Sequence, residues 1–187
     1  MMKKTCLMSL TFSLFTLLPS ALHAQATPAA TRGGIAQAGA SYTVSNEDEY
    51  PGKYLQGMTI YGTFDLNNHL GVEGNVHLVS AFKSYYSYKE TSYDAGLRWT
   101  QHYRKFSPYA KGLVGFGHAT APFRDQIVGG STPGTYFLFA LGVGLDYSLT
   151  DKMNIRCLDF EYQRWPNFPP HGLTPPLLSV GAAYRFR

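Results

Sequence analysis

Alternation of hydrophobic and polar residues with a period of two is the dominant pattern along the chain. In segment 135–149 the odd positions are bulky and apolar, whereas the even positions are mostly small or polar. This period predicts a β-strand, because successive side chains of a strand leave opposite faces. Asp146 and two glycines share the face opposite the bulky residues, as in a strand with lipid on one side and a polar interior on the other. Soluble antiparallel sandwiches alternate too, so this segment alone leaves both folds open.

The same alternation recurs in seven other segments, so we expect eight strands in all: 35–44, 54–66, 70–82, 91–100, 109–117, 135–149, 153–163 and 177–187. The connections between them are alternately long and tight. An even number of strands with tight turns at one end and long loops at the other is typical of bacterial outer-membrane barrels. Within 153–163 the apolar neighbours Cys157 and Leu158 interrupt the alternation and predict a β-bulge.

The charged residues of the predicted strands fall on one face. The inward set is Asp65, Glu73, Asp94, Arg98, Lys111, Asp146, Arg156, Asp159, Glu161 and Arg185. No Asp, Glu, Lys or Arg falls on the outward face in the middle of a predicted strand, where Arg or Lys at the bilayer midplane would cost about 2–4 kcal/mol. We therefore predict an all-β protein, an eight-stranded antiparallel up-and-down transmembrane β-barrel spanning residues 35–187.

Eight strands enclose a space that side chains can fill. Because buried charges need partners, we expect the six inward acids and four inward bases to pair in a network that plugs the barrel. A wet path between these charges would instead make a narrow porin-like channel for ions or small solutes, and this alternative stays open.

The N-terminus has the pattern of a secretory signal. Lys3 and Lys4 precede an apolar run from Cys6 to Leu18, and Leu22-His23-Ala24 resembles a cleavage site. We expect a signal peptide at 1–24, a short periplasmic lead at 25–34 and then the barrel domain, although cleavage after Ala26 is also compatible. Removal of the signal would leave Cys157 as the single cysteine, which excludes an internal disulfide.

Composition and charge exclude several classes of function. Loss of Lys3 and Lys4 would lower the formal net charge from +4 to +2, and without a basic cluster nucleic-acid binding is not expected. Beyond the N-terminal run, no stretch approaches the apolar length of a membrane helix. The five histidines that follow the expected signal, at 69, 77, 102, 118 and 171, lack the paired spacing of metal ligands. We expect no metal and no cofactor.

Catalysis also lacks a candidate site. His77 and Ser80 have opposite parity and would point to different faces, while His118 and Asp125 have no suitably placed serine between them. No Gly-x-Ser-x-Gly motif occurs. We predict that the protein is not an enzyme. A lipid A-modifying activity, which some eight-stranded barrels have, remains the second alternative.

Aromatic residues have two candidate roles. Near strand ends, Trp99, Tyr147 and Tyr184 are expected to form the girdle at the lipid headgroups. Possible contacts of the outer surface are Tyr85, Tyr86, Tyr88, Phe123, Arg124 and Trp165, because these residue types favour interfaces.

With its signal, eight alternating strands, tight turns and a final strand ending Tyr184-Arg185-Phe186, the sequence resembles the OmpA/opacity-type outer-membrane β-barrel domain family. Segments 106–112 and 144–150 are similar to strand entries and exits in that family. The resemblance implies recognition of Tyr184 and Phe186 by the outer-membrane insertion machinery, although here Arg187 follows the terminal aromatic residue. We expect no peptidoglycan-binding domain and no tethering to the cell wall.

These observations predict an integral outer-membrane protein with a structural or surface-interaction role in the Gram-negative cell envelope. Its expected partners are outer-membrane lipid, lipopolysaccharide and the insertion machinery, and we expect a monomer. The N-terminus and tight turns are expected in the periplasm and the long loops outside the cell.

Overall fold

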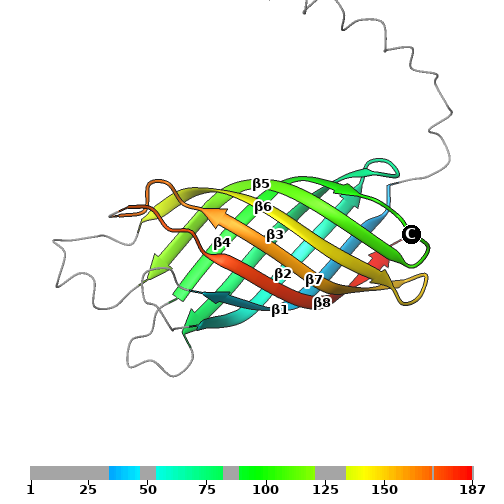
Figure 1. Ribbon diagram of the computed structural model, residues 1–187, viewed down its shortest axis with the longest axis horizontal. Coiled ribbons are helices and arrows are strands. Elements are labelled where there is room, and N and C mark those ends of the chain that lie inside the picture. Colours follow the sequence, from blue (N-terminus) through cyan, green and yellow to red (C-terminus); the bar gives the residue numbers. More distant parts are fainter. Residues whose placement is uncertain (1–33, 47–53, 82–88, 121–133, 170, 187) are drawn as a thin grey trace, which may run out of the picture. The chain divides into compact units, whose positions relative to one another are not determined.

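A computed structural model describes residues 34–46, 54–81, 89–120, 134–169 and 171–186. In this part of the chain eight antiparallel strands form a closed barrel (Figure 1). The strands are β1 (Ala36–Asn46), β2 (Tyr54–Asp65), β3 (Leu70–Ala81), β4 (Lys89–Thr100), β5 (Phe106–Thr120), β6 (Thr135–Ser148), β7 (Met153–Arg164) and β8 (Pro176–Phe186). No helix long and apolar enough to cross a membrane occurs among the described residues.

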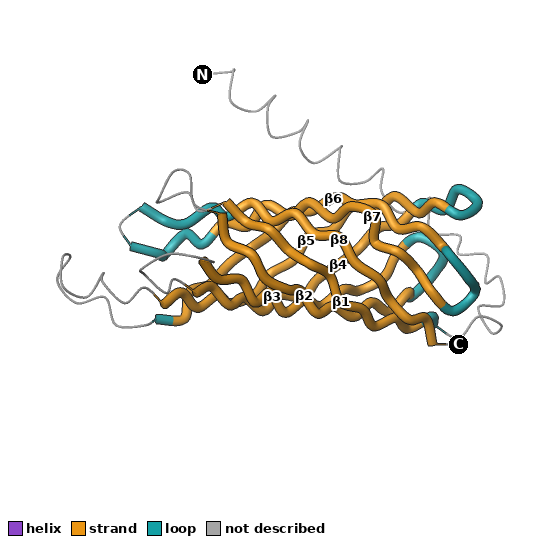
Figure 2. Tube along the Cα trace, turned by 90° about the horizontal axis from the view of Figure 1, so that it is seen from below, coloured by secondary structure: helices purple, strands orange, loops and turns teal. Residues whose placement is uncertain are grey.

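Each strand pairs with its neighbours in the sequence, and β1 also pairs with β8 (Figure 2). In this closing pair Ala36 is opposite Phe186 and Ser45 is opposite Leu177. Closure gives every strand a partner on both sides and leaves no free sheet edge. This satisfies the requirement that backbone N–H and C=O groups in hydrocarbon be hydrogen-bonded within the protein. The predicted fold is confirmed.

The tight turns are held by side chains that accept backbone hydrogen bonds. Between β2 and β3, the Asn67 Oδ1 accepts from the backbone N–H groups of His69 and Leu70, at 2.9 and 2.7 Å. Between β6 and β7, the Thr150 Oγ1 accepts from Met153 at 3.0 Å. Asn and Thr favour turns because they can make these local bonds. The described turns lie at one end of the barrel, and the β7–β8 connection lies at the other (Figure 1).

The two faces of the barrel differ as the alternation predicts. Leu141 is 66% exposed on the outer face, whereas Arg156 is buried in the interior. Within the described strands, the outward-facing charges are Lys89 and Arg164, each at a strand terminus. An apolar surface of this kind is stable in lipid and would be unfavourable in water.

Some strand bounds differ from those predicted. β5 extends from 106 to 120, beyond the predicted 109–117, and β4 begins at Lys89 rather than Thr91. Glu90 therefore points inward and is buried. The predicted bulge in β7 is confirmed, because the register with β8 shifts between Arg156 and Asp159.

A charge on the outer face should destabilise the barrel according to its depth. We expect Leu141→Arg, in the middle of β6, to lower the free energy of unfolding in lipid vesicles by about 2–4 kcal/mol. Leu149→Arg, just beyond the end of β6, should cost about 1 kcal/mol or less because it lies near the interface. Urea unfolding of both variants in the same vesicles tests this. Equal losses would contradict a membrane-spanning orientation.

Candidate functional site

Glu73 on β3 is the centre of a buried set of ion pairs in the barrel interior. Its carboxylate accepts two hydrogen bonds from the Arg156 guanidinium, at 2.9 and 3.2 Å. It also accepts from Arg98 at 3.1 Å and from Lys111 at 3.0 Å. One acid on β3 therefore bonds to bases from β4, β5 and β7, so the contacts cross the interior of the barrel.

Three further acids complete this arrangement. Arg98 also pairs with Asp146 at 2.6 Å, and Lys111 pairs with Asp159 and Glu161, both at 2.9 Å. We call the set the ion-pair network: Glu73, Arg98, Lys111, Asp146, Arg156, Asp159 and Glu161. All seven side chains are buried. Removing them from water is costly, and mutual pairing with good geometry offsets that cost.

Two tyrosines pack against the cations of the network. The Arg156 guanidinium lies 3.6 Å from the ring centroid of Tyr61, and the Arg98 guanidinium lies 3.8 Å from that of Tyr109. Such contacts are attractive because the ring face carries partial negative charge. The Tyr109 ring occupies the space that a side chain at Gly144 would need. Interior glycine therefore makes room for the large aromatic residues.

A second group of polar residues continues from the network toward the loop end. Glu161 lies 3.4 Å from the His77 Nε2 and accepts a hydrogen bond from the Gln163 amide at 2.8 Å. The Gln163 Oε1 in turn accepts from the Trp165 indole N–H at 2.9 Å. The interior thus contains one connected polar path from Glu73, through Lys111 and Glu161, to Trp165.

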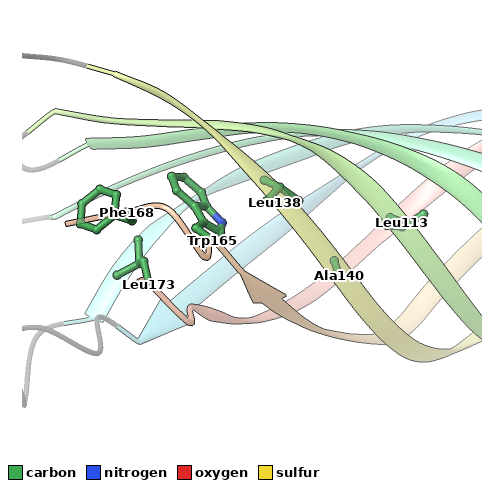
Figure 3. Packing of buried hydrophobic residues seen from close by; sticks show 6 residues of the cluster. All are labelled: Leu113, Leu138, Ala140, Trp165, Phe168 and Leu173. Carbon is green, nitrogen blue, oxygen red and sulfur yellow. The ribbon is translucent and has the colours of Figure 1, made fainter. Parts of the chain in front are cut away.

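Beyond this path, toward the loop end, apolar side chains of the β7–β8 connection pack inside the barrel. We call Trp165, Phe168 and Leu173 the plug; all three are buried, and they pack with Leu113, Leu138 and Ala140 of β5 and β6 (Figure 3). The Trp165 and Phe168 rings meet edge to face with centroids 6.2 Å apart. The indole lies directly over Gly117, where a Cβ atom would collide with it.

The plug corrects one expectation. Trp165 was predicted as a possible contact of the outer surface, but it is only 1% exposed and lies inside the barrel. The bulge in β7 explains this, because it places Asp159, Glu161, Gln163 and Trp165 on the inner face. The other residues predicted for the outer surface lie outside the described residues: Tyr85, Tyr86, Tyr88, Phe123 and Arg124.

Of the ten charges predicted to face inward, three lie outside the ion-pair network. Asp94 is buried and lies 3.2 Å from His77. Asp65 and Arg185 are half-buried near the turn end; Arg185 donates to Asn154 at 2.8 Å, and Asp65 makes no ion pair with another described residue. Tyr184 and Phe186, the predicted insertion signal, lie on the outer face with ring centroids 5.0 Å apart.

Sequence reasoning missed the uncharged members of the interior. Thr59 and Gln163 both hydrogen-bond within it, at positions of inward parity. Their parity was the signal that could have identified them, because both are polar residues on the face that carries the charges. Leu113 and Leu138 also have inward parity, and their apolar character was the available signal that the interior is not polar throughout.

One interior arrangement has the order of a hydrolase triad. The Thr59 hydroxyl lies 2.7 Å from His77 Nδ1, and His77 Nε2 lies 3.2 Å from Asp94. However, Thr59 is 1% exposed and its hydroxyl is also bonded to Thr43 at 2.6 Å. A nucleophile must reach its substrate, so this hydroxyl is poorly placed to act as one. His77 and Ser80 lie on opposite faces of β3, as expected.

The closed sheet, its apolar exterior and its charged interior define the class: an integral β-barrel membrane protein. Comparison with family models gives the family. Residues 12–186 match the outer membrane protein beta-barrel domain, so the chain belongs to this family and is an outer-membrane protein. A search of curated proteins found no significant match.

Solved structures of bacterial outer-membrane proteins share the fold. Neisserial surface protein A matches with a TM-score of 0.63 and 17% identity, over 83% of this chain and 98% of that one. OprG of Pseudomonas aeruginosa gives 0.57 and 16%, over 83% and 96%. Ail, the attachment invasion locus protein of Yersinia pestis, solved with the heparin analogue sucrose octasulfate, gives 0.56 and 23%, over 83% and 100%. These similarities concern the fold alone.

Removing the central acid should have a large effect on stability. We expect Glu73→Gln to lower the free energy of unfolding by about 3–5 kcal/mol, because three buried cations lose their common partner. Asp65→Asn is the matched control, since this acid is half-buried and outside the network; its effect should be within about 0.5 kcal/mol. Urea unfolding followed by tryptophan fluorescence measures both. Similar losses in the two variants would show that the network is not a specific source of stability.

Proposed function

We propose that this protein is a non-conducting barrel with a structural or surface-interaction role in the outer membrane. The observation that carries this proposal is the filled interior, where the ion-pair network crosses the barrel and the plug packs over it. Water and ions need a continuous path to cross, and paired side chains in contact leave little room in a barrel of eight strands.

The proposed surface role rests on the connections at the loop end. In the β7–β8 connection, Trp165 pairs with Leu173 in an isolated β-bridge, and both side chains are anchored inside the barrel. Asn167 and Pro166, which lie between them, are exposed. A connection anchored in this way loses less conformational entropy on contact with a partner than a free loop would. Two neighbours in fold carry the names surface protein and attachment invasion protein, which adds support by analogy alone.

The proposed orientation places the described turns in the periplasm and the loop end outside the cell, as in bacterial barrels generally. Lipid and lipopolysaccharide would surround the apolar outer face. The insertion machinery would recognise Tyr184 and Phe186 at the end of β8. We further propose that the barrel acts as a monomer, because closure leaves no strand edge for pairing with a second copy.

Conductance tests the filled interior. We expect the wild-type protein to give no steady unitary steps in planar bilayers, with a known porin as the positive control. Trp165→Ala should also be silent, because the ion-pair network still crosses the interior beneath the plug. Steps from the variant alone would place the barrier at the plug. Steps from the wild-type protein would favour the narrow channel and contradict the proposal.

Labelling on intact cells tests the orientation. In a Cys157→Ser background, we expect Asn167→Cys to react with a membrane-impermeant maleimide, because this position lies at the loop end and is exposed. Asp151→Cys, in the exposed β6–β7 turn, is the matched control and should react only after the outer membrane is permeabilised. The reverse pattern would invert the proposed topology.

A further inference from the structure

His77, Asp94 and Glu161 meet in the barrel interior, where Glu161 of the ion-pair network joins two residues outside that network. They come from β3, β4 and β7 and are all buried. One nitrogen or oxygen atom of each lies within 4.8 Å of the others. The arrangement arises from the closed fold, because the three residues are far apart in the sequence and lack the local spacing of a metal motif.

The distances around His77 fit the ligands of a small metal ion. Its Nε2 lies 3.2 Å from Asp94 Oδ2 and 3.4 Å from Glu161 Oε1. Despite this proximity, Nε2 makes no hydrogen bond of acceptable geometry, although the side chain is only 2% exposed. Ligands bound tetrahedrally at zinc bond lengths are separated by about 3.3 Å. From this we infer that His77, Asp94 and Glu161 form a binding site for a divalent transition-metal ion such as Zn²⁺.

Neighbouring residues hold each ligand in place. Asn75 donates to Asp94 Oδ1 at 2.9 Å, and Lys111 pairs with Glu161 Oε2 at 2.9 Å. In both carboxylates one oxygen thus has its own partner, and the other faces His77 Nε2 and also accepts from the Gln163 amide. Such outer contacts orient metal ligands and are a regular part of metal sites.

The histidine is oriented by a chain of hydroxyl groups. His77 Nδ1 lies 2.7 Å from Thr59 Oγ1, which lies 2.6 Å from Thr43 Oγ1, and that atom lies 2.8 Å from Ser179 Oγ. With Nδ1–H donating to Thr59, each hydroxyl can donate to the next one. This direction leaves the lone pair on Nε2, the tautomer that ligates a metal.

Charge balance supports a divalent ion. Among the described residues, the ion pairs of the interior join five acids, Glu73, Asp94, Asp146, Asp159 and Glu161, and three permanent cations, Arg98, Lys111 and Arg156. Glu90 is also buried and makes an interaction that is not one of these pairs. Protonation of His77 would supply one of the two missing positive charges, whereas a divalent ion supplies both. Buried charge is costly unless it is compensated.

Three protein ligands leave a fourth position for water, next to the Gln163 amide that contacts both carboxylates, at 2.8 and 3.4 Å. Because the plug packs next to Gln163 inside the barrel, we expect the ion to enter while the barrel folds. The experiment therefore refolds the full chain in detergent micelles with one equivalent of Zn²⁺, or with EDTA, and removes loosely bound metal by gel filtration. We expect one zinc per chain by elemental analysis and a higher melting temperature than in EDTA.

His77→Gln tests the assignment, and His69→Gln, in the exposed β2–β3 turn, is the matched control. We expect zinc affinity to fall at least roughly tenfold in the first and to be unchanged in the second. If the His77→Gln variant fails to fold, the test is to add Co²⁺ while the wild-type protein refolds. We then expect the visible absorption of tetrahedrally bound Co²⁺. Wild-type protein without zinc, zinc retained equally by both variants, or a Co²⁺ spectrum of the hydrated ion would overturn the proposal. Histidine would then act as the balancing cation.

Discussion

Compensation of charge inside the barrel is the constraint on which the rest of the structure depends. Lipid outside requires an apolar surface, so ionisable residues in the strands can point only inward. There they are removed from water and need partners at hydrogen-bond distance. Glu73 is the partner of three bases, each from a different strand. The network therefore acts as the core of the protein, in the place where a soluble domain has apolar packing.

Apolar packing remains, and its largest cluster among the described residues surrounds the plug. Leu113 and Leu138 face inward beside the plug, and the Trp165 indole joins the apolar part to the polar part through its hydrogen bond to Gln163. An indole suits such a boundary, because it combines a large apolar surface with one donor. The described interior thus passes along the barrel axis from the ion-pair network to the apolar cluster around the plug.

Much of this arrangement could be predicted from sequence, because one rule governs it. The two-residue period assigned faces correctly along most strands, including the change of register at Cys157 and Leu158. The position of Trp165 was missed, since its proline-rich context indicated an exposed loop, whereas the chain folds back into the barrel after β7. The partners of Glu73 were also beyond sequence reasoning. Parity shows that a residue points inward, but shear and closure determine which strands face each other across the interior.

The bulge in β7 has a consequence for how this chain can change. Before it, even-numbered residues such as Arg156 face inward; after it, odd-numbered residues such as Asp159 do so. The alternation of β7 therefore consists of two segments of opposite parity that meet at the bulge. Loss of Cys157 would remove the bulge and leave Asp159 and Glu161 facing inward, because this residue is the extra one between two segments of regular alternation. Loss of one residue elsewhere in β7 would instead turn the side chains on one side of the deletion toward lipid. Length variation should consequently be tolerated in the long connections, and as loss of the extra residue at this junction, more readily than elsewhere in β7.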